Sequence, residues 1–99
     1  MLIEENYMDS GYCIASVAEV MGISAVYAGR KFKNSFNKSF NTYLAEFRCA
    51  KACEYLTETN KKSAEIAELC GFANTAYYNH TFKKHMKIAP LQYREAYKK

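Results

Sequence analysis

The segment IAELCGFA, residues 66–73, decides the fold, because nearly the same pattern occurs earlier in the chain as VAEVMGIS, residues 17–24. Each copy has an apolar residue, alanine, glutamate, two further residues, glycine and another apolar residue, and the copies lie 49 residues apart. Beyond the glycine the offset becomes 50, and the matching pairs are Tyr27 with Tyr77, Phe32 with Phe82, and Lys33 with Lys83. Such a repeat indicates one structural unit built twice.

Each copy predicts a short helix, a tight turn and a longer helix. Ser16 with Glu19 three residues later forms a capping box at the start of the first short helix, and Ser63 is the expected N-cap of the second. Gly22 and Gly71 are expected to end these helices, because glycine adopts the left-handed conformation at a helix C-terminus without strain.

The longer helices begin directly after these turns. Ser24 and Asn74 are expected to cap them with their side-chain oxygens. A short helix, a glycine-containing turn and a second helix form the helix-turn-helix pattern, and the sequence contains this pattern twice.

Between the copies, residues 39–60 read SFNTYLAEFRCAKACEYLTETN and predict a single amphipathic helix that starts at a serine cap. About 20 residues at 1.5 Å each make this helix roughly 30 Å long. Successive major-groove faces of B-DNA lie about 34 Å apart, so this spacing would allow one chain to present two helices to one side of a duplex.

The expected fold is all-α, with two homeodomain-like helix-turn-helix subdomains joined by the long helix and about seven helices in total. Short flanking helices are predicted for IEENYM before the first unit and for APLQYREAY after the second, with Pro90 at a helix start. We predict three parts: residues 1–38 with the N-terminal helix and first subdomain, residues 39–60 with the linker helix, and residues 61–99 with the second subdomain and C-terminal helix.

Length and composition limit the class of protein. The 99 residues, 49% of them hydrophobic, make one domain with a modest core. No apolar run is long enough to span a bilayer, and the N-terminus is acidic where a signal peptide would be basic, so we expect no membrane partner and a cytoplasmic location. Cys13, Cys49, Cys53 and Cys70 are expected to be reduced, structural thiols.

The sequence predicts no metal, cofactor or catalytic site. Cys49 and Cys53 lie four apart on the predicted linker helix, but structural zinc usually needs four ligands in tight pairs. His80 and His85 are five apart and are expected to face different directions. No carboxylate pair, nucleophile motif or phosphate-binding glycine loop is present, so we expect no enzyme activity.

Basic charge is concentrated in two windows of the chain. No acidic residue lies between Glu19 and Glu46 or between Glu68 and Glu95. The basic residues in these windows are Arg30, Lys31, Lys33 and Lys38 in the first, and Lys83, Lys84, Lys87 and Arg94 in the second. A solvated surface usually mixes both signs, whereas two basic blocks favour a polyanionic partner.

Helical periodicity separates the inward and outward positions of the two longer helices. The inward positions are Ala28, Phe32 and Phe36 in the first and Tyr78, Phe82 and Met86 in the second. Arg30 and His80 occupy equivalent outward positions, with Asn79 on the flank. Arginine can bind the two acceptors of a guanine edge, asparagine can pair with adenine, and histidine donates or accepts according to its tautomer. Tyr27 and Tyr77 lie nearer the outer face, where they either pack on the short helix or touch a sugar-phosphate backbone.

The residues of the second unit that carry a family pattern are Gly71, Phe72, Asn74, Tyr77, Tyr78, Asn79, His80, Phe82, Lys83, Lys84, Pro90, Tyr93 and Arg94. In the first unit and the linker helix they are Ser24, Tyr27, Arg30, Phe32, Lys33, Phe40, Tyr43, Leu44, Arg48, Ala52 and Leu56. With these residues the chain resembles the DNA-binding domain of the AraC family of bacterial transcription regulators, from about residue 14 to residue 95. The resemblance implies sequence-specific binding of double-stranded DNA for regulation of transcription.

The resemblance also implies that residues 24–36 and 74–86 insert into adjacent major-groove segments. Carried over by position, the base readers are Val26, Gly29, Arg30, Thr75, Ala76, Asn79 and His80. The phosphate contacts are Ser24, Lys33, Ser63, Lys83 and Lys84, and the lysines would add affinity and salt dependence rather than sequence choice. The chain departs from the family at His80, where arginine is common, and at Asn37 and Lys87, where glycine is usual.

Partners follow from the same resemblance: double-stranded DNA, RNA polymerase, and a sensor or receiver domain that this chain does not contain. The chain is then the monomeric output part of a longer regulator, an activator or a repressor, which is dimeric at full length. Two alternatives stay open, namely a basic helical module that binds an acidic protein and a nonspecific nucleic-acid binder. Preference for one duplex sequence would separate the leading interpretation from both.

Overall fold

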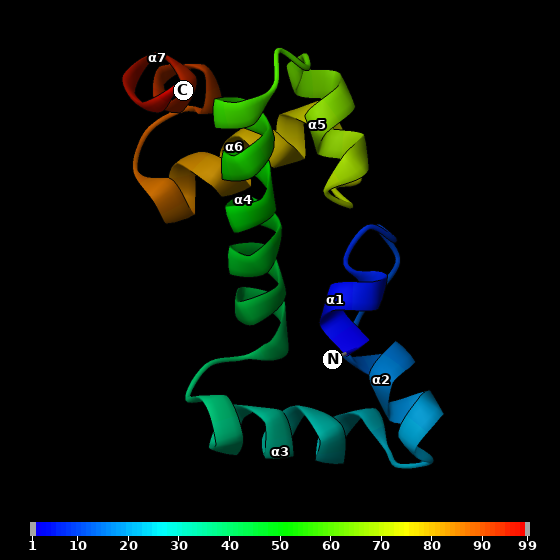
Figure 1. Cartoon of the computed structure of the whole chain (residues 1–99). Coiled ribbons are helices and arrows are strands. Elements are labelled where there is room, and N and C mark those ends of the chain that lie inside the picture. The colour runs from blue at the N-terminus through cyan, green and yellow to red at the C-terminus, as the bar shows by residue number, and fades with distance from the viewer. Residues whose placement is uncertain (1, 99) are drawn as a thin grey trace.

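The computed structural model describes residues 2–98, which form seven α-helices and no β-strand (Figure 1). The helices are α1 (Leu2–Asn6), α2 (Ile14–Met21), α3 (Ala25–Phe36), α4 (Phe40–Glu58), α5 (Ser63–Leu69), α6 (Thr75–Met86) and α7 (Pro90–Tyr97). This confirms the predicted all-α fold with two helix-turn-helix units, α2–α3 and α5–α6. The division of the chain at residues 38 and 60 stays a prediction.

Helix α4 is the axis of the molecule. It runs between α2 and α3 at one end and α5, α6 and α7 at the other, and the chain measures 43 × 22 × 22 Å (Figure 1). Its 19 residues correspond to a length of about 28 Å. Within residues 2–98, no helix combines the length and the apolar character needed to cross a bilayer.

The turns within the two units have the predicted chemistry. Gly22 and Gly71 are left-handed, with φ of 70° and 86°. The Ser24 hydroxyl accepts the Tyr27 backbone N–H at 3.1 Å, and the Asn74 side-chain oxygen accepts the equivalent Tyr77 N–H at 2.7 Å. These caps satisfy backbone donors that the first turn of a helix leaves unpaired. Asn37 and Lys87, at the ends of α3 and α6, are also left-handed, with φ of 61° and 74°.

The predicted starts of the two short helices were wrong. Helix α2 begins at Ile14, and the Ser16 hydroxyl accepts the Cys13 backbone N–H at 3.4 Å instead of capping a helix that starts after it. The earlier start lets Ile14 pack with Val17 against the first core. Ser63 is the first residue of α5, whose N-cap, Lys62, makes no side-chain capping bond.

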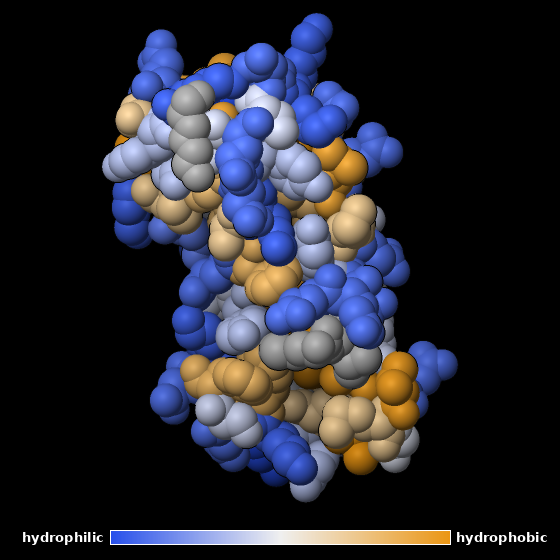
Figure 2. Space-filling model, in the orientation of Figure 1, coloured by the Kyte–Doolittle hydropathy of each residue, from blue (hydrophilic) through white to orange (hydrophobic). Residues whose placement is uncertain are grey.

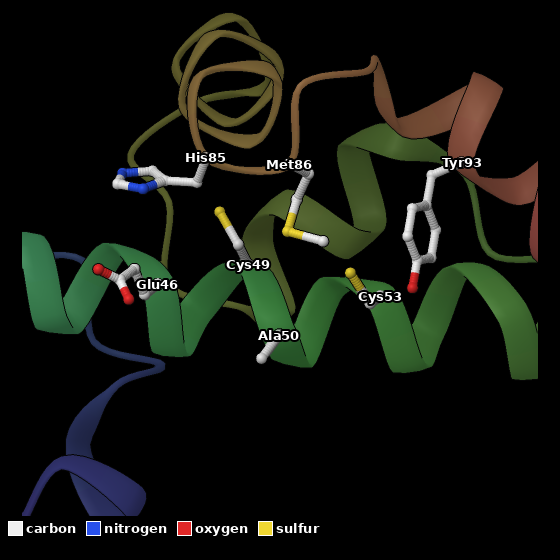
Figure 3. Close-up of a pocket in the computed structure, with 7 residues that line it drawn as sticks. All are labelled: Glu46, Cys49, Ala50, Cys53, His85, Met86 and Tyr93. Carbon is white, nitrogen blue, oxygen red and sulfur yellow. The ribbon is translucent and has the colours of Figure 1, made fainter.

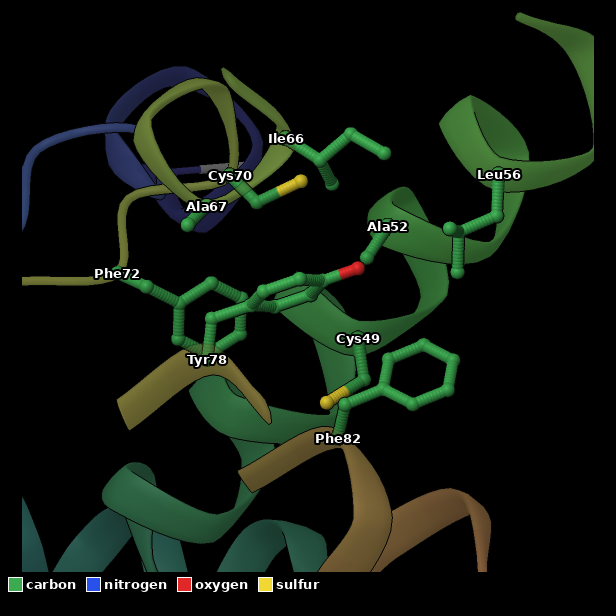
Figure 4. Close-up of a cluster of buried hydrophobic side chains, with 9 residues drawn as sticks. All are labelled: Cys49, Ala52, Leu56, Ile66, Ala67, Cys70, Phe72, Tyr78 and Phe82. Carbon is green, nitrogen blue, oxygen red and sulfur yellow. The ribbon is translucent and has the colours of Figure 1, made fainter. Parts of the chain in front are cut away.

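Two hydrophobic cores flank the middle of α4. The core of the second unit contains Cys49, Ala52, Leu56, Ile66, Ala67, Cys70, Phe72, Tyr78 and Phe82 (Figure 4). Tyr78 and Phe82 are fully buried, as predicted. The first core contains Ile3, Tyr7, Tyr12, Phe40 and Leu44.

The first unit buries its apolar side chains less completely than predicted. Phe36 was expected to face the core but is 42% exposed: it lies at the end of α3, where its ring packs on Phe32 and Tyr43, with centroids 4.5 and 5.2 Å away, at the edge of the first core. Val20 and Met21 at the end of α2 are also exposed. Figure 2 shows hydrophobic side chains gathered at this end of the molecule.

The N-terminal segment is attached to α4 and to the turn of the second unit at one junction. The buried Arg48 donates from Nε to the Tyr7 carbonyl and from Nη2 to the Asp9 carbonyl, both at 2.9 Å. A Cβ on Gly71 would lie 1.9 Å from the same Tyr7 carbonyl oxygen. Glycine at position 71 is therefore required both by its backbone conformation and by the close approach of the N-terminal segment.

Replacing Gly71 with alanine should destabilise the protein far more than the same change at Gly22. At Gly22 an added Cβ meets nothing within 4 Å, so Gly22→Ala should cost only the left-handed strain of about 1 kcal/mol. Gly71→Ala adds a clash with backbone and should cost about 3 kcal/mol or more. Denaturant unfolding of both variants measures the difference, and equal losses of stability would contradict the close approach.

Removing the Arg48 guanidinium should lower the free energy of unfolding by about 3 kcal/mol, because Arg48→Met leaves two carbonyls without their charged donor. Arg48→Lys should restore only part of this loss, since a single ammonium cannot reproduce the planar fork of donors. Thermal and denaturant unfolding give both values. A fully stable lysine variant would show that the charge alone matters.

Candidate DNA-binding surface

Some of the basic side chains outside α3 and α6 are paired with nearby acids. Three lysines form ion pairs: Lys38 with Glu46 at 3.0 Å, Lys51 with Glu54 at 3.4 Å, and Lys61 with Glu65 at 3.3 Å. The acids of these pairs lie on α4 and α5. Such exposed pairs contribute little stability, but they cancel the positive charge of these surfaces.

The arginines outside α3 donate to backbone carbonyls within the protein. Arg48 holds the N-terminal segment, and Arg94 donates to the carbonyls of Leu56, Thr59 and Lys61 at 2.8 to 3.2 Å. Arg94 was counted in the second basic window of the sequence, and its role in that window was interpreted incorrectly. Its guanidinium fixes α7 to the end of α4.

The remaining basic charge lies mainly on α3 and α6, which we call the recognition helices. Arg30, Lys31 and Lys33 on α3 and Lys83 and Lys84 on α6 have no side-chain hydrogen bond or ion pair within residues 2–98, and all five are exposed. Neither helix contains an acidic residue. In the structure, unpaired basic charge is therefore more strongly concentrated on α3 and α6 than the two basic windows of the sequence indicate.

The predicted base readers lie on the solvent side of the recognition helices. Val26 is 72% exposed, although apolar, and Arg30, Ala76, Asn79 and His80 are also exposed. The other two predicted readers, Gly29 and Thr75, are half-buried. The readers predicted for the first unit all lie on α3, and those predicted for the second unit all lie on α6. The role of each residue in reading bases stays a prediction.

Most of the residues predicted to contact phosphates are exposed to solvent. Ser24, Lys33, Lys83 and Lys84 are exposed, whereas Ser63 is half-buried. Tyr27 and Tyr77, for which two roles were left open, are both exposed. The Tyr77 ring contacts Phe72 edge-on at 6.1 Å, so packing accounts for part of its position and leaves the hydroxyl side accessible.

A groove of about 230 Å³ lies between the first half of α4 and α6. It is lined by Asn41, Thr42, Ala45, Tyr77, His80, Thr81, Lys84 and His85. Both histidines border this groove, and His85 also borders a second one that His80 does not reach, so their different directions stay a prediction. Sequence reasoning missed Asn41 and Thr42, since nothing in a helical pattern tells which residues of a distant helix will face them.

A second groove, of about 630 Å³, is lined by Glu46, Cys49, Ala50, Cys53, His85, Met86 and Tyr93 (Figure 3). The Cys49 and Cys53 sulfurs point from α4 to the side where Met86 lies. Burial raises the pKa of the Cys49 and Cys70 thiols to about 12 and also raises the pKa of the Cys53 thiol, so these groups stay protonated and unreactive near neutral pH. Within residues 2–98, no three histidine, cysteine or acidic side chains are arranged to hold a metal ion.

Comparisons with known proteins agree with this geometry. A family model described as a helix-turn-helix domain matches residues 17–96. The uncharacterized HTH-type transcriptional regulator YijO of Escherichia coli K12 is 32% identical over 96 residues, which covers 93% of this chain and 34% of YijO. The chain spans 17% to 57% of the length of the first curated relatives that it matches.

Solved structures share the whole fold. The C-terminal domain of AraT, a response regulator from Geobacillus stearothermophilus, is 35% identical with a TM-score of 0.96, over 99% of this chain and 81% of that domain. The DNA-binding domain of AdpA, solved with a target DNA, has the same fold with a TM-score of 0.87 over 94% of this chain and 83% of that one, at 22% identity. The chain therefore belongs to the AraC family of transcription regulators, as a sequence-specific DNA-binding domain with two helix-turn-helix units.

Proposed function

We propose that α3 and α6 enter two adjacent major-groove segments on one side of a DNA duplex. The observation that carries this proposal is the unpaired positive charge, which is concentrated on the two recognition helices, while Lys38, Lys51 and Lys61 are paired with acids. Helix α4, about 28 Å long, separates the units by nearly one helical repeat of B-DNA, about 34 Å.

In this proposal the exposed outer faces read bases. Arg30 binds the acceptors of a guanine, Asn79 pairs with an adenine, and His80 donates or accepts according to its tautomer. Val26 and Ala76 offer apolar contact to thymine methyl groups, and Gly29, which has no side chain, lets α3 approach the base edges closely. Thr75 begins α6, where its hydroxyl can reach a base or a phosphate.

The proposed phosphate contacts flank these readers. Lys33, Lys83 and Lys84 lie one turn or less beyond Arg30 and His80 and bind phosphates on either side of the occupied grooves. Ser24 keeps a hydroxyl hydrogen to donate, although its oxygen already accepts the Tyr27 N–H. Ser63, the first residue of α5, is proposed to donate its hydroxyl hydrogen to a phosphate.

The domain is, in our proposal, the output part of a longer cytoplasmic activator that contacts RNA polymerase. The fraction of the curated relatives that it spans supports a further sensor or receiver domain, as does the similarity to AraT, a response regulator. The domain itself is proposed to be monomeric, to hold no cofactor and to catalyse no reaction, while the full-length regulator is dimeric.

Removing a base reader should weaken binding to the preferred site and relax its sequence choice. Once a selection from random duplexes has identified that site, Arg30→Ala and Asn79→Ala should each cost about 1 to 3 kcal/mol on it and much less on unrelated duplexes. Titrations on the selected duplex and on single-base variants measure this. Equal losses on every sequence would remove these residues from base readout and would favour a nonspecific binder.

Removing a phosphate contact should have the opposite pattern. Lys83→Ala should weaken binding to all duplexes alike and reduce the slope of log K against log salt by about one unit. Glu68→Gln, on α5, provides a control that changes charge without removing a proposed contact. If the wild-type chain binds no duplex better than an unrelated protein of equal charge in low salt, an acidic protein partner becomes the better interpretation.

A further inference from the structure

We infer that the groove between α4 and α6 holds a phosphate group of the DNA backbone, so that Asn41, Thr42, Thr81 and His85 belong to the DNA-binding surface. The inference rests on the proposed function and adds a site between the two recognition helices. None of these four residues is placed on the surface by the base-reading or phosphate-contact assignments.

The lining of the groove suits an anion. One wall is formed by Asn41, Thr42 and Ala45 of α4, and the other by Tyr77, His80, Thr81, Lys84 and His85 of α6. The lining contains an ammonium, two imidazoles, an amide and three hydroxyls, and it contains no carboxylate. A volume of about 230 Å³ is ample for one phosphate group, and Lys84 disfavours a metal cation at the same place.

The donors of the groove are unused within the protein. Thr81 lines the groove, and its hydroxyl makes no hydrogen bond to any residue among 2–98. This hydroxyl is therefore available to a ligand in the groove. The side chains of Asn41, Lys84 and His85 likewise have no hydrogen-bond partner in the described part of the chain.

Thr42 is also able to donate into the groove. Its hydroxyl oxygen accepts a hydrogen bond from the Ser39 hydroxyl at 3.0 Å, and its backbone N–H donates to the same Ser39 oxygen at 3.2 Å. The hydroxyl hydrogen of Thr42 remains free to bind an oxygen of the phosphate. The bond to Ser39 fixes the side chain at the start of α4, which reduces the entropy lost on binding.

The position of the groove identifies the phosphate as part of the DNA backbone. Only three residues separate the end of α3 from the start of α4, so the first turns of α4 lie at the end of one recognition helix. The other wall belongs to α6, the second recognition helix. When two helices occupy successive major-groove segments, the backbones bordering the intervening minor groove pass between them. In the proposed binding mode, the groove therefore faces this path.

A chemical double-mutant cycle tests the inference with the complete 99-residue chain. Single methylphosphonates, which remove one backbone charge each, are placed along both strands between the two major-groove segments of the selected duplex. In the wild-type protein, one position should weaken binding by about tenfold, the loss expected for charge-assisted hydrogen bonds. The same substitution should cost measurably less in Asn41→Ala and in Thr81→Val than in the wild type, because each variant has already lost one of the groove's donors to that phosphate.

The variants are chosen so that folding does not decide the result. Asn41 is exposed on a helix and its side chain makes no described hydrogen bond, and Thr81→Val keeps the shape of the side chain. Lys51→Gln is the matched control, because Lys51 lies on another face of α4, paired with Glu54, and should leave the tenfold effect unchanged. Equal methylphosphonate losses in the wild type and in both groove variants would overturn the inference while leaving sequence-specific binding intact. Failure of the wild type to prefer any duplex would overturn the proposed function as well.

Discussion

The two hydrogen bonds from Arg48 to the Tyr7 and Asp9 carbonyls hold together segments on which the rest of the structure depends. Arg48 lies in the middle of α4, the carbonyls belong to the segment that follows α1, and the turn at Gly71 closes over the same place, with no room for a Cβ. The first core is built on that N-terminal segment, and α6 starts just after the turn. The junction therefore couples the two helix-turn-helix units, and it does so at a buried guanidinium whose loss would leave backbone acceptors unsatisfied.

This use of arginine explains how a small net charge can support a strongly basic face. The chain has 14 basic and 10 acidic residues, a net charge of only +4. Arg48 and Arg94 bind backbone carbonyls, and three lysines are paired with acids near α4 and α5. What remains unpaired is concentrated on α3 and α6. Because screening in physiological salt limits charge effects to about 8 Å, this local arrangement determines the attraction to DNA more than the net charge does.

The features that could be predicted from the sequence are those that depend on residues close together in the chain. The turn glycines, the caps at Ser24 and Asn74 and the burial of Tyr78 and Phe82 each depend on a few neighbouring residues and a known periodicity. The errors arise where tertiary packing decides. Helix α2 starts before Ser16 because Ile14 is needed in the first core, and Arg94 serves a distant carbonyl cluster that no spacing reveals. The presence of Asn41 and Thr81 in the lining of one groove could not be predicted either, since the two residues are remote in the chain.

The two recognition helices pack against cores of different size. Helix α6 is held by Tyr78 and Phe82 in the larger core, with α7 packed beside it and fixed by Arg94. Helix α3 rests on a smaller core, ends at an exposed Phe36, and carries Gly29 in its interior, where glycine weakens a helix by about 1 kcal/mol relative to alanine. Regions with fewer buried contacts open more readily. On this ground we expect α3 to open more readily than α6 in the free domain.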